Sequence, residues 1–493
     1  MPKLQFRAAL TSPGMPYLGG LSAFELVFLG TEAILYAGSK AFGALTGLTL
    51  REGGTAQSLG SWLVPGRGSG FLLDDIAWIT LNGQSRLLVS EAGSGHVESF
   101  AISANGALGS SIFLSASSYS GATTLLAPAG NGQLLMGAIG TEGIKRYIGV
   151  LSGNTTLAQT ETDTPKSALA DVADMIELTI GNARYVLTAS QAEGALSTFR
   201  LAADGSLTLA DTIGAKEGLW IGGLDGMASV TVQGTTFAVV SGMLSNSLTA
   251  LRVNALGVMY VTDHVLDSLA TRFGRVDAVA GFSASDRGFL IAGGGDDGLS
   301  LLELLPDGRF LHHQALPQVT GQTLTNITAI TTAKFASEVQ VFVAGSNHGL
   351  TQFFLATTHL ATPITGSVTN DLLTGSAADD LILGNDGNDT IDGGAGDDVL
   401  FGQGGADRLT GGAGADIFVF DQDILRDQIN DFEIGIDRID LSRWEGIYHP
   451  SLLTLRIRPT GGDLLFHDLS VRIVTDDASP LTQDFLHADN FLF

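Results

Sequence analysis

Aspartates recur every nine residues in the last quarter of the chain, and a glycine-rich stretch precedes all but the first two, which follow Ser and then Val-Thr or Ala-Ala instead. Six consecutive nine-residue units fill 366–419, and each opens with glycine and carries a large apolar residue at its eighth position. Carboxylates are hard oxygen ligands, and six or more oxygens at about 2.3–2.6 Å in adaptable geometry favour Ca²⁺ over Mg²⁺. The repeat therefore predicts calcium binding in this segment. The expected ligands, at the sixth position of each unit, are Asp371, Asp380, Asp389, Asp398, Asp407 and Asp416.

The glycines and the apolar residues of the units indicate how the chain must fold to position these carboxylates. Glycine permits positive φ angles and close backbone approach, so a coil of two units can turn twice between two short strands. The eighth residues, from Leu373 to Phe418, would then stack into a narrow aliphatic core that grows by adding coils. We therefore expect a parallel β-roll with the carboxylates in its loops. A flexible linker is the alternative, against which six units in register argue.

The units GNDGNDTID, GGAGDDVLF, GQGGADRLT and GGAGADIFV resemble the RTX (hemolysin-type) calcium-binding nonapeptide. The segment 427–442, DQINDFEIGIDRIDLS, is similar to the cap that follows such arrays in secreted proteases of the serralysin type, although no HExxH occurs in the chain. The resemblance implies a bacterial, extracellular protein exported by type I secretion machinery through an uncleaved C-terminal signal. The closing residues 484–493 are the candidate signal.

The charge of the chain is concentrated in the same region. The chain has 25 basic and 51 acidic residues, a net charge of −26, and 366–493 contains 24 acidic residues and 7 arginines, hence −17 of that total. Without calcium, repulsion among these carboxylates is expected to keep the segment unfolded. The acidity argues against a nucleic-acid partner. The chain has no cysteine, no N-terminal apolar segment typical of a signal peptide and no apolar run of about 18 residues.

Seven strand-like runs, 47 to 53 residues apart, organise the first 360 residues. Each run is followed by a small polar turn and a further strand, and several strands in each of seven units predict a seven-bladed β-propeller. The N-terminal strand 4–10 is expected to fill the last place in the seventh blade and so remove a free edge. Two β-sandwiches or a β-solenoid are the alternatives. The small residues that end the runs are Ala37, Ser90, Gly137, Thr188, Ser241, Ala292 and Ala344.

The predicted chain is thus all-β. Residues 1–360 form the propeller, 366–419 the RTX β-roll, and 420–493 a β cap with the export signal. The strand rhythm and Asp-Gly turns of the propeller are similar to those of lactonase-type propellers, but this resemblance covers no catalytic motif.

A second group of acidic residues falls where the innermost strand of each predicted blade begins. Four carboxylates around one channel mouth could hold a divalent metal and activate water, and Asp174 and Glu177 could contribute. Alternatively each carboxylate accepts hydrogen bonds from backbone N–H groups of its own loop, which the repeated placement favours. The four residues are Asp75, Asp171, Asp225 and Asp277, with Ser22, Thr123 and Asn326 at the corresponding places.

Three functions are compatible with these features. The first is a secreted calcium-binding protein whose propeller binds a polysaccharide, a cell surface or another copy of itself. The second is a metal-dependent hydrolase with lactone or phosphate-ester substrates at the channel mouth, and the third is a structural surface-layer component. No GxSxG elbow, P-loop or dinucleotide fingerprint occurs, which favours binding, but the sequence leaves open whether the protein is an enzyme.

Overall fold

The structure is a computed structural model that describes residues 2–11, 15–65, 72–82, 84–91, 96–114, 122–130, 132–139, 143–150, 155–268, 270–346, 349–487 and 490–492. The chain divides into two compact units. The propeller unit comprises Leu4–Ser283 and Gly288–Leu355, and the C-terminal unit comprises Ala356–Phe493 with Met1–Lys3 and Ala284–Arg287. Short 3-10 turns are the only helical elements in the described ranges. None of the helices found there is long and apolar enough to span a bilayer.

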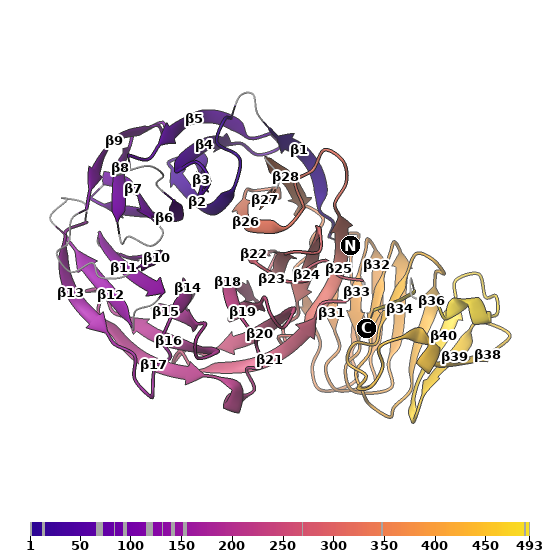
Figure 1. Ribbon diagram of the computed structural model, residues 1–493. Helices are drawn as coiled ribbons and strands as arrows, with labels where there is room; N and C mark the ends of the chain where they lie inside the picture. Colours follow the sequence, from indigo (N-terminus) through magenta and orange to yellow (C-terminus); the bar gives the residue numbers. More distant parts are fainter. Residues whose placement is uncertain are drawn as a thin grey trace. The chain divides into compact units, whose positions relative to one another are not determined.

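Seven four-stranded antiparallel sheets, counted over the described residues, form the propeller unit. They are arranged around a common axis with the first strand of each blade innermost (Figure 1). The predicted seven-bladed propeller is therefore confirmed, and the sandwich and solenoid alternatives are not needed.

The strands of the first four blades are as follows. The first blade contains β2 (Leu21–Leu29), β3 (Glu32–Ser39), β4 (Ala44–Leu50) and β5 (Gln57–Leu63). The second contains β6 (Leu73–Leu81), β7 (Gln84–Glu91), β8 (Val97–Ile102) and β9 (Leu108–Phe113). The third contains β10 (Ala122–Gly130), β11 (Gln133–Ile139), β12 (Ile144–Ile148) and β13 (Thr156–Glu161). The fourth contains β14 (Val172–Ile180), β15 (Ala183–Ser190), β16 (Ala195–Leu201) and β17 (Leu207–Ile213), followed by the 3-10 turn η2 (Ala215–Glu217).

The remaining three blades complete the ring. The fifth contains β18 (Leu224–Val232), β19 (Thr235–Gly242), β20 (Ser247–Val253) and β21 (Met259–Leu266). The sixth contains β22 (Ala278–Ala284), β23 (Arg287–Gly293), β24 (Gly298–Leu304) and β25 (Phe310–Pro317). The seventh contains β26 (Ile327–Lys334), β27 (Glu338–Gly345), β28 (Leu350–Ala356) and, from the N-terminus, β1 (Gln5–Leu10).

The small residues that mark the repeat lie in the buried second strand of each blade, and two of them show why a small side chain is used. The first strand of the blade carries a β-bulge near its start, for example between Leu73 and Ile76. A bulge leaves a backbone N–H without its ladder partner. The Ser90 hydroxyl accepts the Asp75 N–H at 3.0 Å, and the Ser241 hydroxyl accepts the Gly226 N–H at 2.9 Å. These hydroxyls satisfy the bulged backbone inside the propeller.

The N-terminal strand closes the ring of blades. It pairs antiparallel with β28, with Gln5 opposite Phe354 and Leu10 opposite Leu350. The Arg7 guanidinium donates two hydrogen bonds to the buried Glu338 carboxylate, at 2.7 and 2.6 Å, and the Gly53 N–H donates a third at 2.8 Å. A bidentate, buried pair of this kind adds geometric specificity to the closure.

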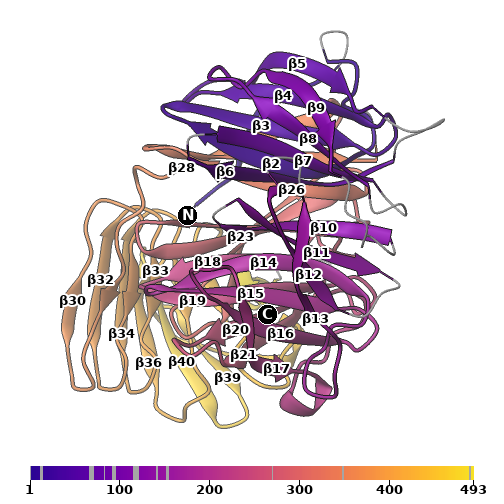
Figure 2. The ribbon, with the colours of Figure 1, turned by 90° about the vertical axis from the view of Figure 1, so that its left-hand side faces the viewer.

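The C-terminal unit is a parallel β-roll in which alternate nonapeptides contribute strands to two sheets. One sheet runs β29 (Ile364–Thr365), β31 (Leu381–Leu383), β33 (Val399–Phe401), β35 (Ile417–Val419), β37 (Arg438–Asp440) and β41 (Phe491–Leu492). The other runs β30 (Leu372–Thr374), β32 (Thr390–Ala395), β34 (Arg408–Ala413), β36 (Asp427–Phe432), β40 (Leu469–Thr475), β39 (Gly462–Phe466) and β38 (Thr454–Ile457). Successive strands of this second sheet lie side by side in Figure 2.

The register of the roll confirms the eighteen-residue coil. Ile382 pairs with Leu400, which pairs with Phe418, and these eighth-position side chains are fully buried. The segment after the array continues both sheets, because β36 pairs with β34 and β37 pairs with β35, both in parallel. The 3-10 turns η3 (Pro450–Leu452) and η4 (Gln483–Phe485) lie in this cap. Its buried residues, including Trp444, belong to one core with the column of the roll.

Candidate calcium-binding site

The sixth-position aspartates form two ladders along the roll. In each ladder one carboxylate oxygen accepts the backbone N–H of the aspartate one coil earlier. The Asp380 N–H donates to Asp398 Oδ1 at 2.8 Å, and the Asp398 N–H donates to Asp416 Oδ1 at 2.9 Å. The Asp371 N–H likewise donates to Asp389, and the Asp389 N–H to Asp407, at 2.7 and 2.8 Å. All six predicted ligands therefore lie in these two ladders.

The second carboxylate oxygen distinguishes the last four units from the first two. Oδ2 is buried and has no hydrogen-bond partner among the described residues in Asp389, Asp398, Asp407 and Asp416. In the first unit Ser367 donates both its N–H and its hydroxyl to Asp371 Oδ2, at 2.6 and 2.8 Å. Ser376 does the same for Asp380, at 2.7 and 2.9 Å. A buried carboxylate oxygen without a donor is costly, and this makes the last four units the stronger candidates for a cation.

The first glycine of each unit faces this oxygen. A Cβ added to Gly393 would lie 2.3 Å from Asp398 Oδ2, and one added to Gly411 would lie 2.2 Å from Asp416 Oδ2. Even alanine at this position would therefore collide with the carboxylate. The glycines are required here for close approach, in addition to the turns with positive φ at Gly387 and Gly405.

The ladders hold their carboxyl groups in an environment unfavourable to negative charge. Burial, with the neighbouring charges of Asp416 and Asp380, raises the pKa of Asp398 to about 7. Burial, with the charges of Asp389 and Asp423, raises that of Asp407 to about 6. A cation bound among such carboxylates would reverse this balance and favour the ionised form.

Two sets of residues extend the ladders beyond the sequence-based prediction. At the fifth position, Asp379 Oδ1 accepts the Asp397 N–H, and Asp397 Oδ1 accepts the Ala415 N–H, both at 2.9 Å. In the cap, Asp427 and Asp437 accept the N–H groups of Asp407 and Asp416, respectively, at 2.9 Å. The fifth position is Asn or Asp in the first four units and Ala in the last two, a pattern that was visible in the sequence. The cap residues follow at 20 and 21 residues instead of 18, so a strict nine-residue period misses them.

The predicted channel residues occupy the first strands of the blades and their approach. Asp75 Oδ1 accepts the N–H of Ile76 at 2.8 Å, and its Oδ2 accepts the N–H of Leu126 in the next blade at 2.7 Å. Asp174 accepts the N–H groups of Met175 and Met227, again in its own strand and the next blade, at 2.7 and 2.6 Å. These carboxylates therefore link neighbouring blades, a role that local turn chemistry did not predict.

The other residues predicted at the channel mouth do not share these hydrogen-bond partners. Burial and the charge of Asp277 raise the pKa of Asp225 to about 6, and Asp277 Oδ1 is buried without a described hydrogen-bond partner. Asp171 has a positive φ of 50°, and its carbonyl accepts the Gln191 N–H. Glu177 pairs with Arg184 at 2.6 Å. The side chain of Thr123 lies outside the described residues.

Among the described residues of the two units, carboxylates alone do not form a metal-binding group. In the ranges that the structure describes, no three His, Cys, Asp or Glu side chains are close enough together to hold an ion. A calcium site in the roll would therefore combine carboxylates with backbone carbonyls of the turns, which calcium accepts readily. The metal site at the channel mouth stays a prediction.

Comparison with protein families matches the RTX calcium-binding nonapeptide repeat (4 copies) at residues 365–400 and 393–423. No curated protein matches the chain. Among solved structures, the chain is similar to Chaetomium thermophilum Sqt1, whose structure was determined bound to the N-terminus of the ribosomal protein L10. That similarity has 11% identity and a TM-score of 0.44, and covers 69% of this chain and 86% of the other. The C-terminal region of this all-β chain carries RTX calcium-binding nonapeptide repeats, folded as a parallel β-roll next in sequence to a seven-bladed propeller.

Proposed function

We propose that the protein is secreted, that calcium binds along the aspartate ladders of its roll, and that its propeller binds an extracellular ligand. The proposed calcium ligands are the sixth-position carboxylates, with Asp389, Asp398, Asp407 and Asp416 as the principal four, together with turn carbonyls. The single observation that carries the calcium proposal is the row of four buried Oδ2 atoms without a described donor.

The chemistry of the ladders supports calcium rather than a softer metal. The nonapeptides contain no cysteine and no histidine, so the available donors are oxygens. Calcium tolerates six to eight oxygens in variable geometry, whereas magnesium demands a near-ideal octahedron.

Calcium-dependent folding also supports a secreted protein. The ladders bring many of the 24 acidic residues of 366–493 close together, and without a cation their repulsion opposes folding. Such a chain stays unfolded where calcium is scarce and folds where it is millimolar, which suits export of the unfolded chain by a type I system. The candidate signal 484–493 includes positions 488, 489 and 493, which lie outside the described residues.

The propeller is the proposed ligand-binding part. A polysaccharide or a cell surface is the proposed partner, and a rigid ring of blades presents many loops for such contacts. The hydrolase alternative has less support, because Asp75 and Asp174 already accept two backbone N–H groups each.

The calcium proposal is tested on the full chain with Trp444, the only tryptophan of the C-terminal unit, which is buried in the core of the roll and cap. The chelated protein is titrated with Ca²⁺ or Mg²⁺ while tryptophan fluorescence is recorded, and the Trp444→Phe variant supplies the background. We expect a blue shift with Ca²⁺ that Mg²⁺ does not produce and that the variant lacks. A spectrum unchanged by Ca²⁺ would refute calcium-dependent folding.

A further inference from the structure

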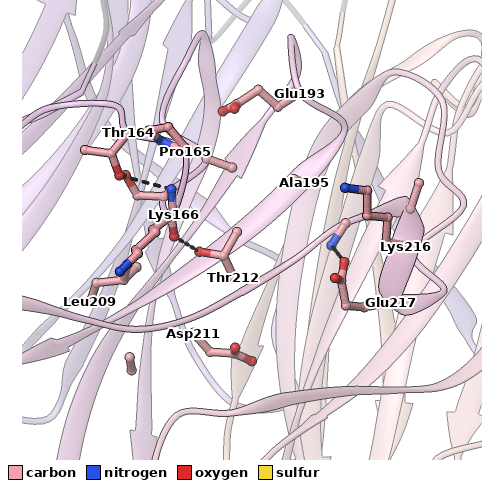
Figure 3. Close-up of a pocket in the computed structure, with 15 residues that line it drawn as sticks. Thr164, Pro165, Lys166, Glu193, Ala195, Leu209, Asp211, Thr212, Lys216 and Glu217 are labelled. Atoms are coloured by element: carbon pink, nitrogen blue, oxygen red, sulfur yellow. Dashed lines mark hydrogen bonds between the residues drawn. The ribbon is translucent and has the colours of Figure 1, made fainter.

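An open pocket of about 640 Å³ lies at one edge of the fourth blade (Figure 3). It is formed by the segment before β14, the turn between β15 and β16, the end of β17 and the turn η2. These segments meet because the strands are antiparallel, so that β14 and β16 begin where β15 and β17 end. Its volume is within the range of about 300–1,000 Å³ that is usual for ligand sites.

Two lysines line this pocket, out of six in the whole chain. Lys166 and Lys216 lie on opposite sides of it, and Lys216 reaches from η2 toward its middle (Figure 3). Neither ammonium group makes an ion pair or side-chain hydrogen bond with any residue that the structure describes. By contrast, Lys40 pairs with Asp74 and Lys334 donates to the Ser283 carbonyl.

Each carboxylate that lines the pocket accepts a hydrogen bond through one of its two oxygens. Glu193 accepts the Ser190 hydroxyl at 3.2 Å, Asp211 accepts the Met259 N–H at 2.8 Å, and Glu217 accepts the Gly214 N–H at 3.0 Å. The two lysines therefore offer a ligand side-chain donors that have no described acceptor, and each carboxylate keeps a second oxygen with no donor among the described residues. Because three carboxylates outnumber the two lysines, the long-range field of the pocket does not attract an anion, which would be held only by direct contact with the ammonium groups.

An exposed tryptophan adjoins the pocket. Trp220 is 72% exposed, yet its indole N–H donates to the carbonyl of Ala215, a lining residue, at 3.1 Å. The hydrogen bond fixes the ring beside the pocket and leaves much of the residue open to water. An indole exposed in this way is a flat apolar surface on which a ring with an apolar face can stack.

We propose that this pocket binds an acidic oligosaccharide. Lys166 and Lys216 would contact sugar carboxylates, and Trp220 would stack against the apolar C–H face of one sugar ring. A neutral sugar would not pair with the lysine ammonium groups, and a simple inorganic anion would not stack on the indole. This inference rests on the proposed ligand-binding role of the propeller but not on calcium binding by the roll.

Binding is measured by calorimetry on the full, calcium-loaded chain after free calcium has been removed. The probe is a short oligogalacturonate. Its methyl ester is the control without negative charge, and inorganic phosphate is the control anion without an apolar face. A charge-assisted contact is worth about 1.5 kcal/mol or more, or about tenfold in affinity. We therefore expect Lys216→Gln and Lys166→Gln each to weaken oligogalacturonate binding about tenfold and Lys216→Arg to retain most of it. Trp220→Ala should weaken it similarly, and Trp220→Phe less.

Lys40→Gln is the matched charge control, and Leu256→Ala, at another exposed apolar residue, is the matched control for the tryptophan. The proposal is overturned if oligogalacturonate does not bind, if pocket and control variants bind alike, or if the methyl ester or phosphate binds equally well. A different extracellular ligand whose binding is insensitive to these variants would preserve the propeller's proposed role while excluding this pocket. A failure of calcium binding would instead appear in the Trp444 titration and leave these results unaffected.

Discussion

Asp398→Asn is expected to change the stability of the C-terminal unit in opposite directions with and without calcium. The Asp398 side chain is fully buried, its Oδ1 accepts the Asp380 N–H, and its Oδ2 has no described partner. The amide can keep the first hydrogen bond, because its oxygen remains an acceptor. The substitution removes the negative charge and places an NH2 group, which cannot coordinate a cation, at the position of Oδ2.

The two effects have different magnitudes. Because burial raises the pKa of Asp398 to about 7, ionisation at neutral pH opposes folding of the calcium-free unit, and removing the charge should stabilise it. After discounting for screening by solvent, we expect this gain to be on the order of 1 kcal/mol. One site occupied at about 100 times its Kd contributes about 2.7 kcal/mol, and losing it removes that increment. The variant should therefore be more stable than wild type in chelator and less stable in calcium.

The assay follows Trp444 of the full chain. Denaturant unfolding is measured in millimolar calcium, and, because the calcium-free unit is expected to be unfolded, its refolding in chelator is measured as a stabilising osmolyte is added. Asp392→Asn is the matched control, because Asp392 lies on β32 with an exposed side chain outside the ladders. Two results would refute this expectation: an equal change, in both variants, in the stability gained from calcium, or a loss of stability of the calcium-free protein in Asp398→Asn.

Three further predictions concern the propeller and the roll. Glu338→Gln should destabilise the propeller by about 3 kcal/mol, because it breaks the buried ion pair with Arg7 that closes the ring. Glu177→Gln, which breaks an exposed ion pair, should cost less than about 1 kcal/mol. Denaturant unfolding of the two variants measures the difference. Burial raises the pKa of Asp75 from 3.8 to about 7, so the folded propeller binds more protons than the unfolded chain and should lose stability as pH rises through this range. Asp75→Asn should reduce the dependence of the melting temperature on pH. An unchanged pH dependence would contradict this role of Asp75. Gly393→Ala should abolish most of the stability that calcium adds, because the new methyl group displaces Asp398. Gly446 has a positive φ but open space around it, so Gly446→Ala should lower stability without changing the gain from calcium. Melting with and without calcium compares the two variants.

Much of the fold was predictable because its periods are long and regular. A spacing of about 50 residues between buried strands is compatible with few architectures, and the structure confirms seven blades. The nine-residue period likewise predicted the parallel roll, because a side chain such as Leu400 can be buried in every coil only if the coils stack in register. The domain boundaries and the ligand roles of individual aspartates stay predictions.

The sequence by itself determined which residues repeat, and therefore the seven blades, the eighteen-residue coil and the placement of the ladder carboxylates in loops. Only the tertiary structure decided which atoms of those residues are already satisfied. Ser376 donates hydrogen bonds to Asp380 Oδ2, whereas Gly393, at the corresponding place, has no side chain that could donate to Asp398 Oδ2. In the propeller, Asp75 accepts an N–H from the next blade. The pocket beside Trp220 also emerges only in three dimensions, since its walls are segments of one blade that are separated in sequence by whole strands. The physical reason is that a repeat specifies backbone geometry locally, whereas hydrogen-bond satisfaction depends on which neighbours the completed fold brings within reach.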